Sequence, residues 1–275
     1  MADSPAGILR ENFGVGRILG DTFSVFFSRF LQIAFLAIIP AAAVALISNL
    51  LIAPILINPD TRYLAVVLSW VASMCASAIS VALVIRYTFD ARSGRRMRTG
   101  SYISSAMAVL VPLIVCSLVS SAVATLVILL FAAPGFVSRN SILLIVLVIP
   151  GIALAIYIAA VWASVTPAIV MEKAGFGSFA RSATLTRNYR WPIFAAILLV
   201  VLLGLGYTQA TNFATNALFV SEIGIQSSLF FYTTMRMIAG AILVAFTGVF
   251  SATLYARLRE IKDGTTVESL AEVFA

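Results

Sequence analysis

Residues 140–171 read NSILLIVLVIPGIALAIYIAAVWASVTPAIVM, and none of them carries a charge. A helix that crosses the hydrocarbon core of a membrane needs about 20 predominantly apolar residues. This stretch is long enough for such a helix. It is typical of a membrane-spanning chain, and the sequence on either side repeats the pattern.

Five further charge-free runs are candidate spans, at 30–59, 63–85, 99–138, 191–221 and 237–256. The run 99–138 is long enough for two crossings, but no turn signal divides its middle. Pro134 and Gly135 form a turn signal near its end, so we expect one helix there, followed by a short loop. Pro112 and Pro150 lie inside spans and are expected to kink them. We therefore predict six transmembrane helices, at about 31–57, 63–86, 103–131, 142–171, 192–216 and 235–256.

The composition supports the same fold class. Apolar residues make up 61% of the 275 residues and charged residues 11%, whereas soluble domains carry about 45–50% and about 25%. A water-soluble fold of this chain would leave large apolar patches exposed. We expect an all-α integral membrane protein with one membrane domain over residues 1–275.

Lysine and arginine near the ends of the spans predict the orientation, because both are enriched in cytoplasmic loops. Fifteen of the 18 basic residues fall on one side of the six predicted spans, in the segments 10–29, 86–98, 173–190 and 257–262. The other side has Arg62, Arg139 and Arg236. This alternation places both termini, including the tail 257–275, in the cytoplasm.

Residues 8–29 precede the first span and mix Phe23 and Phe26 with Arg17, Asp21 and Arg29. The mixture predicts an amphipathic helix on the inner membrane surface. A plain cytoplasmic lead-in is the alternative. The segment is too long and too acidic for the start of a signal peptide, so we expect it to be retained.

The even-numbered spans end alike, with an acid, a base one or two residues later, and Gly two residues after the base. This order occurs at 90–94, 172–175 and 260–264, and the Gly can end a helix in the left-handed conformation. Residues 100–106 (GSYISSA) also align with 177–183 (GSFARSA). We infer three helical hairpins, each preceded by a cytoplasmic interfacial helix. All three would point the same way, unlike the inverted repeats common in secondary transporters.

The residue types exclude most catalytic chemistry. The chain has no histidine, which is the commonest general acid or base and the commonest metal ligand. Cys75 and Cys116 stand alone in apolar runs, without the spacing of a zinc site or a disulfide framework. The carboxylates all fall outside the predicted spans, which argues against an ion-coupled pump. We expect no enzyme activity, no cofactor and no metal.

Two polar groups are candidate sites. Arg181, Arg187 and Arg190 stand among aromatic residues in the fourth connection, where they can contact anionic lipid headgroups; ordinary positive-inside anchoring is the alternative. The fifth span has a polar stripe that could line a cavity, unless it serves hydrogen bonds between helices; its candidate residues are Gln209, Asn212 and Asn216. A seam of small residues in the second span is interpreted as a packing surface, at Ser69, Ala72, Ser73, Ala76, Ser77 and Ser80.

Residues 162–172 (WASVTPAIVME), 179–194 (FARSATLTRNYRWPIF), 254–264 (LYARLREIKDG) and 268–274 (ESLAEVF) resemble a bacterial six-helix membrane family. That family is catalogued as the membrane domain of glycerophosphoryl diester phosphodiesterase. The resemblance covers roughly residues 160–275 and implies the membrane fold and location. It implies no catalytic residue, because phosphodiesterases of that kind use histidine with metal-binding carboxylates.

The function we expect is that of a non-enzymatic polytopic inner-membrane protein, a scaffold or lipid-interacting module in envelope processes. The alternative is a transporter or permease for a neutral or lipidic substrate. Membrane lipids, anionic ones included, are the expected partners. A partner protein is a further expectation, because a membrane domain without chemistry often works through another chain. The net charge of +7 lies beside the spans rather than on one solvated face, so no nucleic-acid partner is expected.

Overall fold

The computed structural model describes residues 13–47, 61–92, 99–219 and 225–264, and within these ranges the chain forms helices and turns but no strand. Six helical segments are long and apolar enough to cross a membrane. This confirms the predicted all-α class with six long apolar helices. The segments are α2 (Phe30–Ile47), α4 (Arg62–Arg92), α6 (Leu110–Val137), α7 (Ser141–Val161) with α8 (Val165–Glu172), α10 (Arg190–Phe219) and α11 (Ile225–Asp263).

Three short helices divide this order into three similar units. Helix α1 (Val15–Ser28) precedes α2 and α4, α5 (Thr99–Ala108) precedes α6 and α7, and α9 (Ser178–Thr186) precedes α10 and α11. The two long helices of each unit pack against each other. The predicted three hairpins, each preceded by a short helix, are therefore present. Which ends face the cytoplasm stays a prediction.

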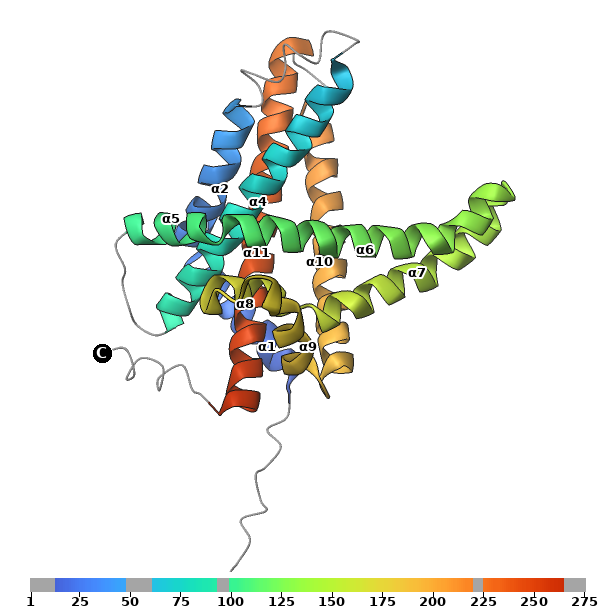
Figure 1. The fold of residues 1–275 in the computed structure, drawn as a ribbon. Helices are drawn as coiled ribbons and strands as arrows, with labels where there is room; N and C mark the ends of the chain where they lie inside the picture. The colour runs from blue at the N-terminus through green and yellow to red at the C-terminus, as the bar shows by residue number, and fades with distance from the viewer. Residues whose placement is uncertain (1–12, 48–60, 93–98, 220–224, 265–275) are drawn as a thin grey trace, which may run out of the picture.

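The three hairpins do not form one parallel bundle. Helices α2, α4, α10 and α11 run alongside one another, whereas α6 and α7 project sideways from them (Figure 1). Helix α11 is central, because it contacts α1, α2, α4 and α10 and contributes to all three clusters of buried apolar side chains. Its Val249, Tyr255 and Leu258 are completely buried.

Helix α1 packs on the bundle through one face. Its buried residues Ile18, Thr22 and Phe26 recur every four positions, as expected for the apolar face of an amphipathic helix. Thr22 and Thr253 of α11 share a hydrogen bond of 2.8 Å between their hydroxyl oxygens. Of the predicted segment 8–29, residues 8–12 lie outside the described ranges, and the helix begins at Val15.

Several helices end beyond the predicted limits of their spans. Helix α4 continues to Arg92 rather than ending at 86, α10 covers 190–219 rather than 192–216, and α11 covers 225–263 rather than 235–256. The predicted limits other than 216 lie at or within two residues of a charged residue. Charge marks the edge of the hydrocarbon layer, but the backbone hydrogen bonds of a helix do not depend on it. The end of the first predicted span, at 48–57, lies outside the described residues.

The turn between α6 and α7 lies three residues later than predicted. Pro134 and Gly135 belong to α6, and the turn comprises residues 138–140. Gly135 lies against α7 so closely that a Cβ atom there would be 2.5 Å from the Cα of Leu144. The side chain of Asn140 caps α7 by accepting hydrogen bonds from the amides of its second and third residues. The glycine therefore serves close packing of two helices and not a turn.

Three prolines explain where helices are interrupted. Pro112, Pro167 and Pro192 are each the third residue of a helix, namely α6, α8 and α10. Proline cannot donate to the carbonyl four residues earlier and its ring clashes with that carbonyl, so the preceding helix stops short. The predicted span 103–131 is accordingly split at Val109. The predicted span 142–171 is split at 162–164.

The interruption at 162–164 is stabilised by hydroxyl groups of α9. Ser182 Oγ donates to the carbonyl of Val161 at 2.9 Å and accepts from the amide of Ser164 at 3.1 Å. Thr186 Oγ1 shares its hydrogen between the same carbonyl, at 3.2 Å, and the carbonyl of Ser182 in its own helix, at 2.9 Å. In a membrane, backbone groups freed by a break must find a partner within the protein. These two side chains supply it, and both are completely buried.

The contribution of Ser182 can be measured by unfolding the purified protein in detergent. We expect Ser182→Ala to lower the free energy of unfolding by about 1–3 kcal/mol, because the buried amide of Ser164 loses its acceptor. Thr184→Ala is the control on the same helix, since that exposed hydroxyl bonds only to the carbonyl of Ala180. Its effect should stay within about 0.5 kcal/mol. Equal losses in the two variants would contradict the assigned role.

Candidate lipid-headgroup site at the ends of α8, α9 and α11

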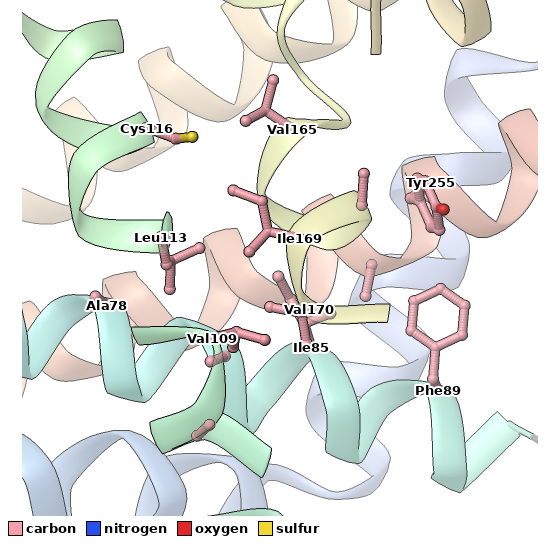
Figure 2. Close-up of a cluster of buried hydrophobic side chains, with 14 of the residues drawn as sticks. Ala78, Ile85, Phe89, Val109, Leu113, Cys116, Val165, Ile169, Val170 and Tyr255 are labelled. Carbon is pink, nitrogen blue, oxygen red and sulfur yellow. The ribbon is translucent and has the colours of Figure 1, made fainter. Parts of the chain in front are cut away.

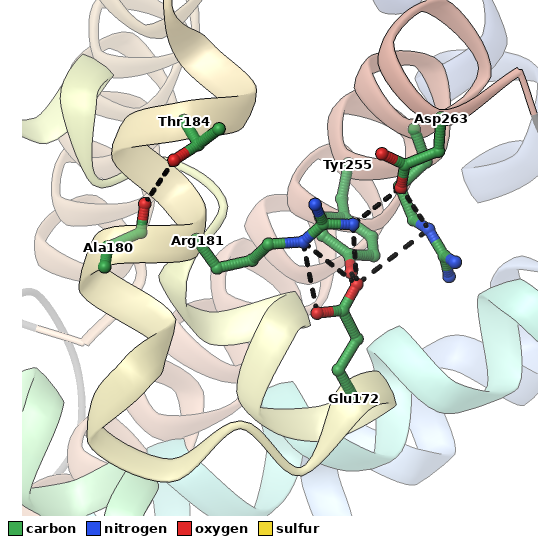
Figure 3. Close-up of polar contacts among 7 residues, drawn as sticks. Glu172, Ala180, Arg181, Thr184, Tyr255 and Asp263 are labelled. Carbon is green, nitrogen blue, oxygen red and sulfur yellow. Dashed lines mark hydrogen bonds and ion pairs between the residues drawn. The ribbon is translucent and has the colours of Figure 1, made fainter.

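A cluster of charged side chains joins the ends of three helices (Figure 3). Arg181 Nε lies 3.2 Å from Glu172 Oε2, and its Nη2 lies 2.6 Å from Asp263 Oδ2. On α11, Arg259 Nε lies 3.3 Å from Asp263 Oδ2 and 3.9 Å from Glu172 Oε1. The buried hydroxyl of Tyr255 donates to Glu172. We call these five residues the charge cluster.

The local fold brings the two carboxylates together at helix ends. Glu172 is the last residue of α8, and the next residue, Lys173, takes the left-handed conformation with φ 52° that ends the helix. Asp263 is the last residue of α11 and is followed by Gly264 with φ 64°. The left-handed glycine predicted after α11 is therefore confirmed. After α8, a lysine takes this role two residues before Gly175.

The charge cluster balances two arginines against two carboxylates. Burial acts to lower the pKa of Arg181, but its hydrogen bonds and ion pairs with Asp263 and Glu172 outweigh this and raise the pKa above the ordinary value. The guanidinium consequently keeps its charge at all physiological pH values. Its positive charge is balanced by Glu172 and Asp263, so Arg181 links α9 to α8 and α11.

The other two arginines predicted to contact headgroups lie in different surroundings. Arg187 follows the last residue of α9 and is exposed. Arg190 is the first residue of α10, is half-buried, and its Nε atom makes no hydrogen bond within the described residues. Of the predicted trio, Arg181 and Arg187 line one cavity, whereas Arg190 is not among its lining residues.

A cavity of about 410 Å³ lies beside the charge cluster. Among the described residues, Arg187 and Lys262 have no acidic side chain within ion-pair distance, whereas Asp263 is already shared by two arginines. The ammonium of Lys262 lies 5.7 Å from the centre of the Tyr189 ring, a cation–π distance. The cavity therefore has an excess of positive charge suited to an anion. Its lining residues are Arg181, Thr184, Leu185, Arg187, Asn188, Lys262 and Asp263.

The turn between α9 and α10 shapes this cavity. Asn188 has φ 76°, in the left-handed region that asparagine tolerates better than most residues. This conformation reverses the chain directly after Arg187, so that Arg187 and Asn188 face the end of α11. The next residue, Tyr189, packs against Phe13 with ring centres 5.3 Å apart.

The predicted polar stripe of α10 lies elsewhere. Gln209 and Asn216 are exposed and Asn212 is half-buried. The side-chain Nδ2 of Asn212 donates to Gln209 Oε1 at 3.4 Å. None of the three lines the cavities described here. Whether the stripe lines a cavity or serves hydrogen bonds between helices stays a prediction.

Sequence reasoning missed Lys262, Asn188 and the acidic half of the charge cluster as site residues. Lys262 and Asp263 were noted only as part of the ending shared by the even-numbered spans. Their proximity to Arg181, about eighty positions earlier, results from the packing of α9 against α11.

A comparison with models of known protein families, a search of curated proteins and a search of solved structures each found no match for this chain. Within the described residues, no three His, Cys, Asp or Glu side chains come together as a metal site would require.

The charge cluster should contribute measurably to stability. We expect Glu172→Gln to lower the free energy of unfolding by about 1–2 kcal/mol, because two arginines and a buried tyrosine lose a charged acceptor. Asp21→Asn is the control, since Asp21 is exposed and makes no ion pair with any of the described residues. Its effect should stay within about 0.5 kcal/mol. Unfolding in detergent gives both values, and equal effects would argue against the cluster.

Proposed function

We propose that this chain is a non-enzymatic polytopic membrane protein that binds the phosphate group of anionic phospholipids in the cavity between α9 and the end of α11. It would act as a scaffold or lipid-interacting module in the bacterial inner membrane. The resemblance of residues 160–275 to the membrane domain of glycerophosphoryl diester phosphodiesterase stays a prediction, in keeping with this proposal.

The observation that carries the proposal is the pair of unpaired cations in one cavity. Arg187 and Lys262 face the same space and lack carboxylate partners among the described residues. Phosphate is the anion that guanidinium and ammonium groups commonly bind. Thr184 and Asn188 line the same cavity and add neutral hydrogen-bonding groups for phosphate or glycerol oxygens.

Two exposed aromatic residues close in sequence to the cavity residues support a membrane lipid as the source of that phosphate. Trp191, the second residue of α10, is 71% exposed, and Phe176, in the short turn between α8 and α9, is 66% exposed. Tryptophan and other aromatic side chains are enriched where a membrane meets water, at the depth of the headgroups. An anion site at the same depth is within reach of a phospholipid.

Loss of both cations should weaken lipid binding. We expect Arg187→Gln/Lys262→Gln to reduce the affinity of the detergent-solubilised protein for a short-chain phosphatidylglycerol by about thirtyfold, because each basic residue contributes about 1 kcal/mol. Native mass spectrometry or a thermal-shift titration measures this affinity. Short-chain phosphatidylcholine, which carries no net charge, should bind the native protein and the variant equally.

A second variant distinguishes a defined site from general attraction. Arg17→Gln/Arg92→Gln removes the same amount of charge at two exposed positions on the predicted cytoplasmic side that do not line the cavity. It should leave the phosphatidylglycerol affinity within about twofold of the native protein, because neither side chain would contact the bound phosphate and exposed charges are screened by salt. If this variant weakens binding as much as the first, the basic residues serve only positive-inside anchoring.

The proposed orientation has a direct test. A reporter that is active only in the cytoplasm, fused after Gly264, should be active, because fifteen of the 18 basic residues fall on that side. The same reporter inserted at Arg139, in the turn between α6 and α7, should be inactive. A reporter that is active only outside the cytoplasm should give the opposite pair of results. Any other combination would contradict the orientation.

A further inference from the structure

A second cavity, of about 440 Å³, lies at the base of the α6–α7 hairpin. Helix α6 contributes Ser117, Ser120 and Ser121 to its lining, and α8 contributes Thr166. The three serines recur at spacings of three and one, which places them on one face of α6. No charged side chain lines this cavity. It shares no lining residue with the basic cavity beside Lys262.

Three hydroxyl groups in this cavity have no hydrogen-bond partner among the described residues, which is unusual for a membrane helix. Ser69, Ser73 and Ser77 of α4 each donate to the carbonyl four residues earlier in their own helix. By contrast, the side-chain hydroxyls of Ser117, Ser120 and Thr166 make no hydrogen bond with any of the described residues. A hydroxyl group in an apolar environment is stabilised by a partner. Three half-buried hydroxyls that converge without one are therefore available to a ligand.

A third cavity, of about 270 Å³, continues the second one toward α4. The two share Leu113, Ser117 and Thr166. The continuation adds Ser73 and Ser77, which the sequence assigned to a packing seam; both are exposed, whereas Ala76 and Ser80 of that seam are buried. The result is one groove with six hydroxyl groups that runs from α4 past α6 to α7.

The walls of the groove are apolar. Figure 2 shows Leu113 and Cys116 of α6 facing Val165 and Ile169 of α8, and all four line the cavity. On the α7 side the lining residues Ala155, Ala159 and Ala163 recur every four positions, and their small side chains leave the space open. The groove is open at the side, because Trp70 at its α4 end is 54% exposed.

We infer that this groove binds an uncharged lipid whose polar part consists of hydroxyl and ester groups, as in a diacylglycerol. Serine and threonine hydroxyls can donate to ester carbonyls and accept from a lipid hydroxyl. The absence of a charged lining residue disfavours phosphate and ammonium groups, which would lose hydration without gaining a counter-charge. The apolar walls and the lateral opening suit acyl chains that remain in the membrane.

The test uses the full chain in phosphatidylcholine nanodiscs that contain a photoactivatable diacylglycerol. Ser117→Ala/Ser120→Ala/Thr166→Val removes the three free hydroxyls at nearly constant volume. We expect cross-linking to residues of α6, α7 and α8 to fall by about tenfold, because two or three hydrogen bonds to the lipid are lost. Thr208→Val is the control, since that hydroxyl bonds within α10, and it should leave the yield unchanged.

A steric variant tests the site independently of hydrogen bonding. Ala159→Leu fills the cavity from α7 and should also abolish the cross-link. Ala153→Leu is its matched control, because Ala153 is an exposed residue of the same helix outside the lining, and it should behave as the native protein. The thermal unfolding midpoint of each variant verifies that it is folded.

Three results would overturn the inference. These are equal cross-linking in the native protein and both cavity variants, equal cross-linking by a photoactivatable phosphatidylcholine, and complete competition by free glycerol, which would indicate a polyol site. This site is independent of the proposed headgroup site. Arg187→Gln/Lys262→Gln should therefore leave diacylglycerol cross-linking unchanged, and either binding activity can fail without the other.

Discussion

Backbone amides and carbonyls inside a membrane have no water to bind, and the arrangement of this protein depends on how one interruption meets that requirement. Pro167 interrupts the helical run at 162–164. The hydroxyl groups of Ser182 and Thr186 form hydrogen bonds with the backbone groups of Val161 and Ser164 that the interruption leaves without helical partners. These bonds hold α9 beneath the break and α8 at a fixed offset from α7. Glu172 at the end of α8 then meets Arg181 of α9 and the last turn of α11. The basic cavity and the hydroxyl-lined groove both adjoin elements that this break positions.

Hydropathy predicted the number and approximate position of the six long helices well, because lipid imposes the same requirement on every span. It predicted their ends less well, since charge at Arg86 or Arg257 marks the membrane edge while the helix continues. Pro134 and Gly135 illustrate a different failure. The pair has the composition of a turn, but Gly135 is required where α7 contacts α6. The local sequence does not reveal this contact, because the contacting residues lie on the other helix. No local sequence pattern predicts that the α6–α7 hairpin projects sideways from the other long helices.

The site was predictable in part. The sequence identified the segment 172–191 as the one rich in basic and aromatic residues, and Arg187 does line a cavity with excess positive charge. The sequence did not show that Arg181 forms ion pairs with Glu172 and Asp263. It also did not show that Arg187 has no such partner among the described residues. That difference depends on contacts between α9 and α11. The hydroxyl-lined groove was missed for the same reason, because Ser73, Ser117 and Thr166 come from three helices and each looks like a packing residue alone.

The α6–α7 hairpin has a mechanical property that follows from its two interruptions. Its first leg begins after the break at Val109 and its second leg ends at the break at 162–164, so both attachments lie at one end. A helix of 28 residues is about 42 Å long at 1.5 Å per residue. A rotation of about 10° at the base would displace the far turn by about 7 Å. The hydroxyl-lined groove lies at this attached end. A small change in the angle of the hairpin there would therefore move its far turn by a large distance.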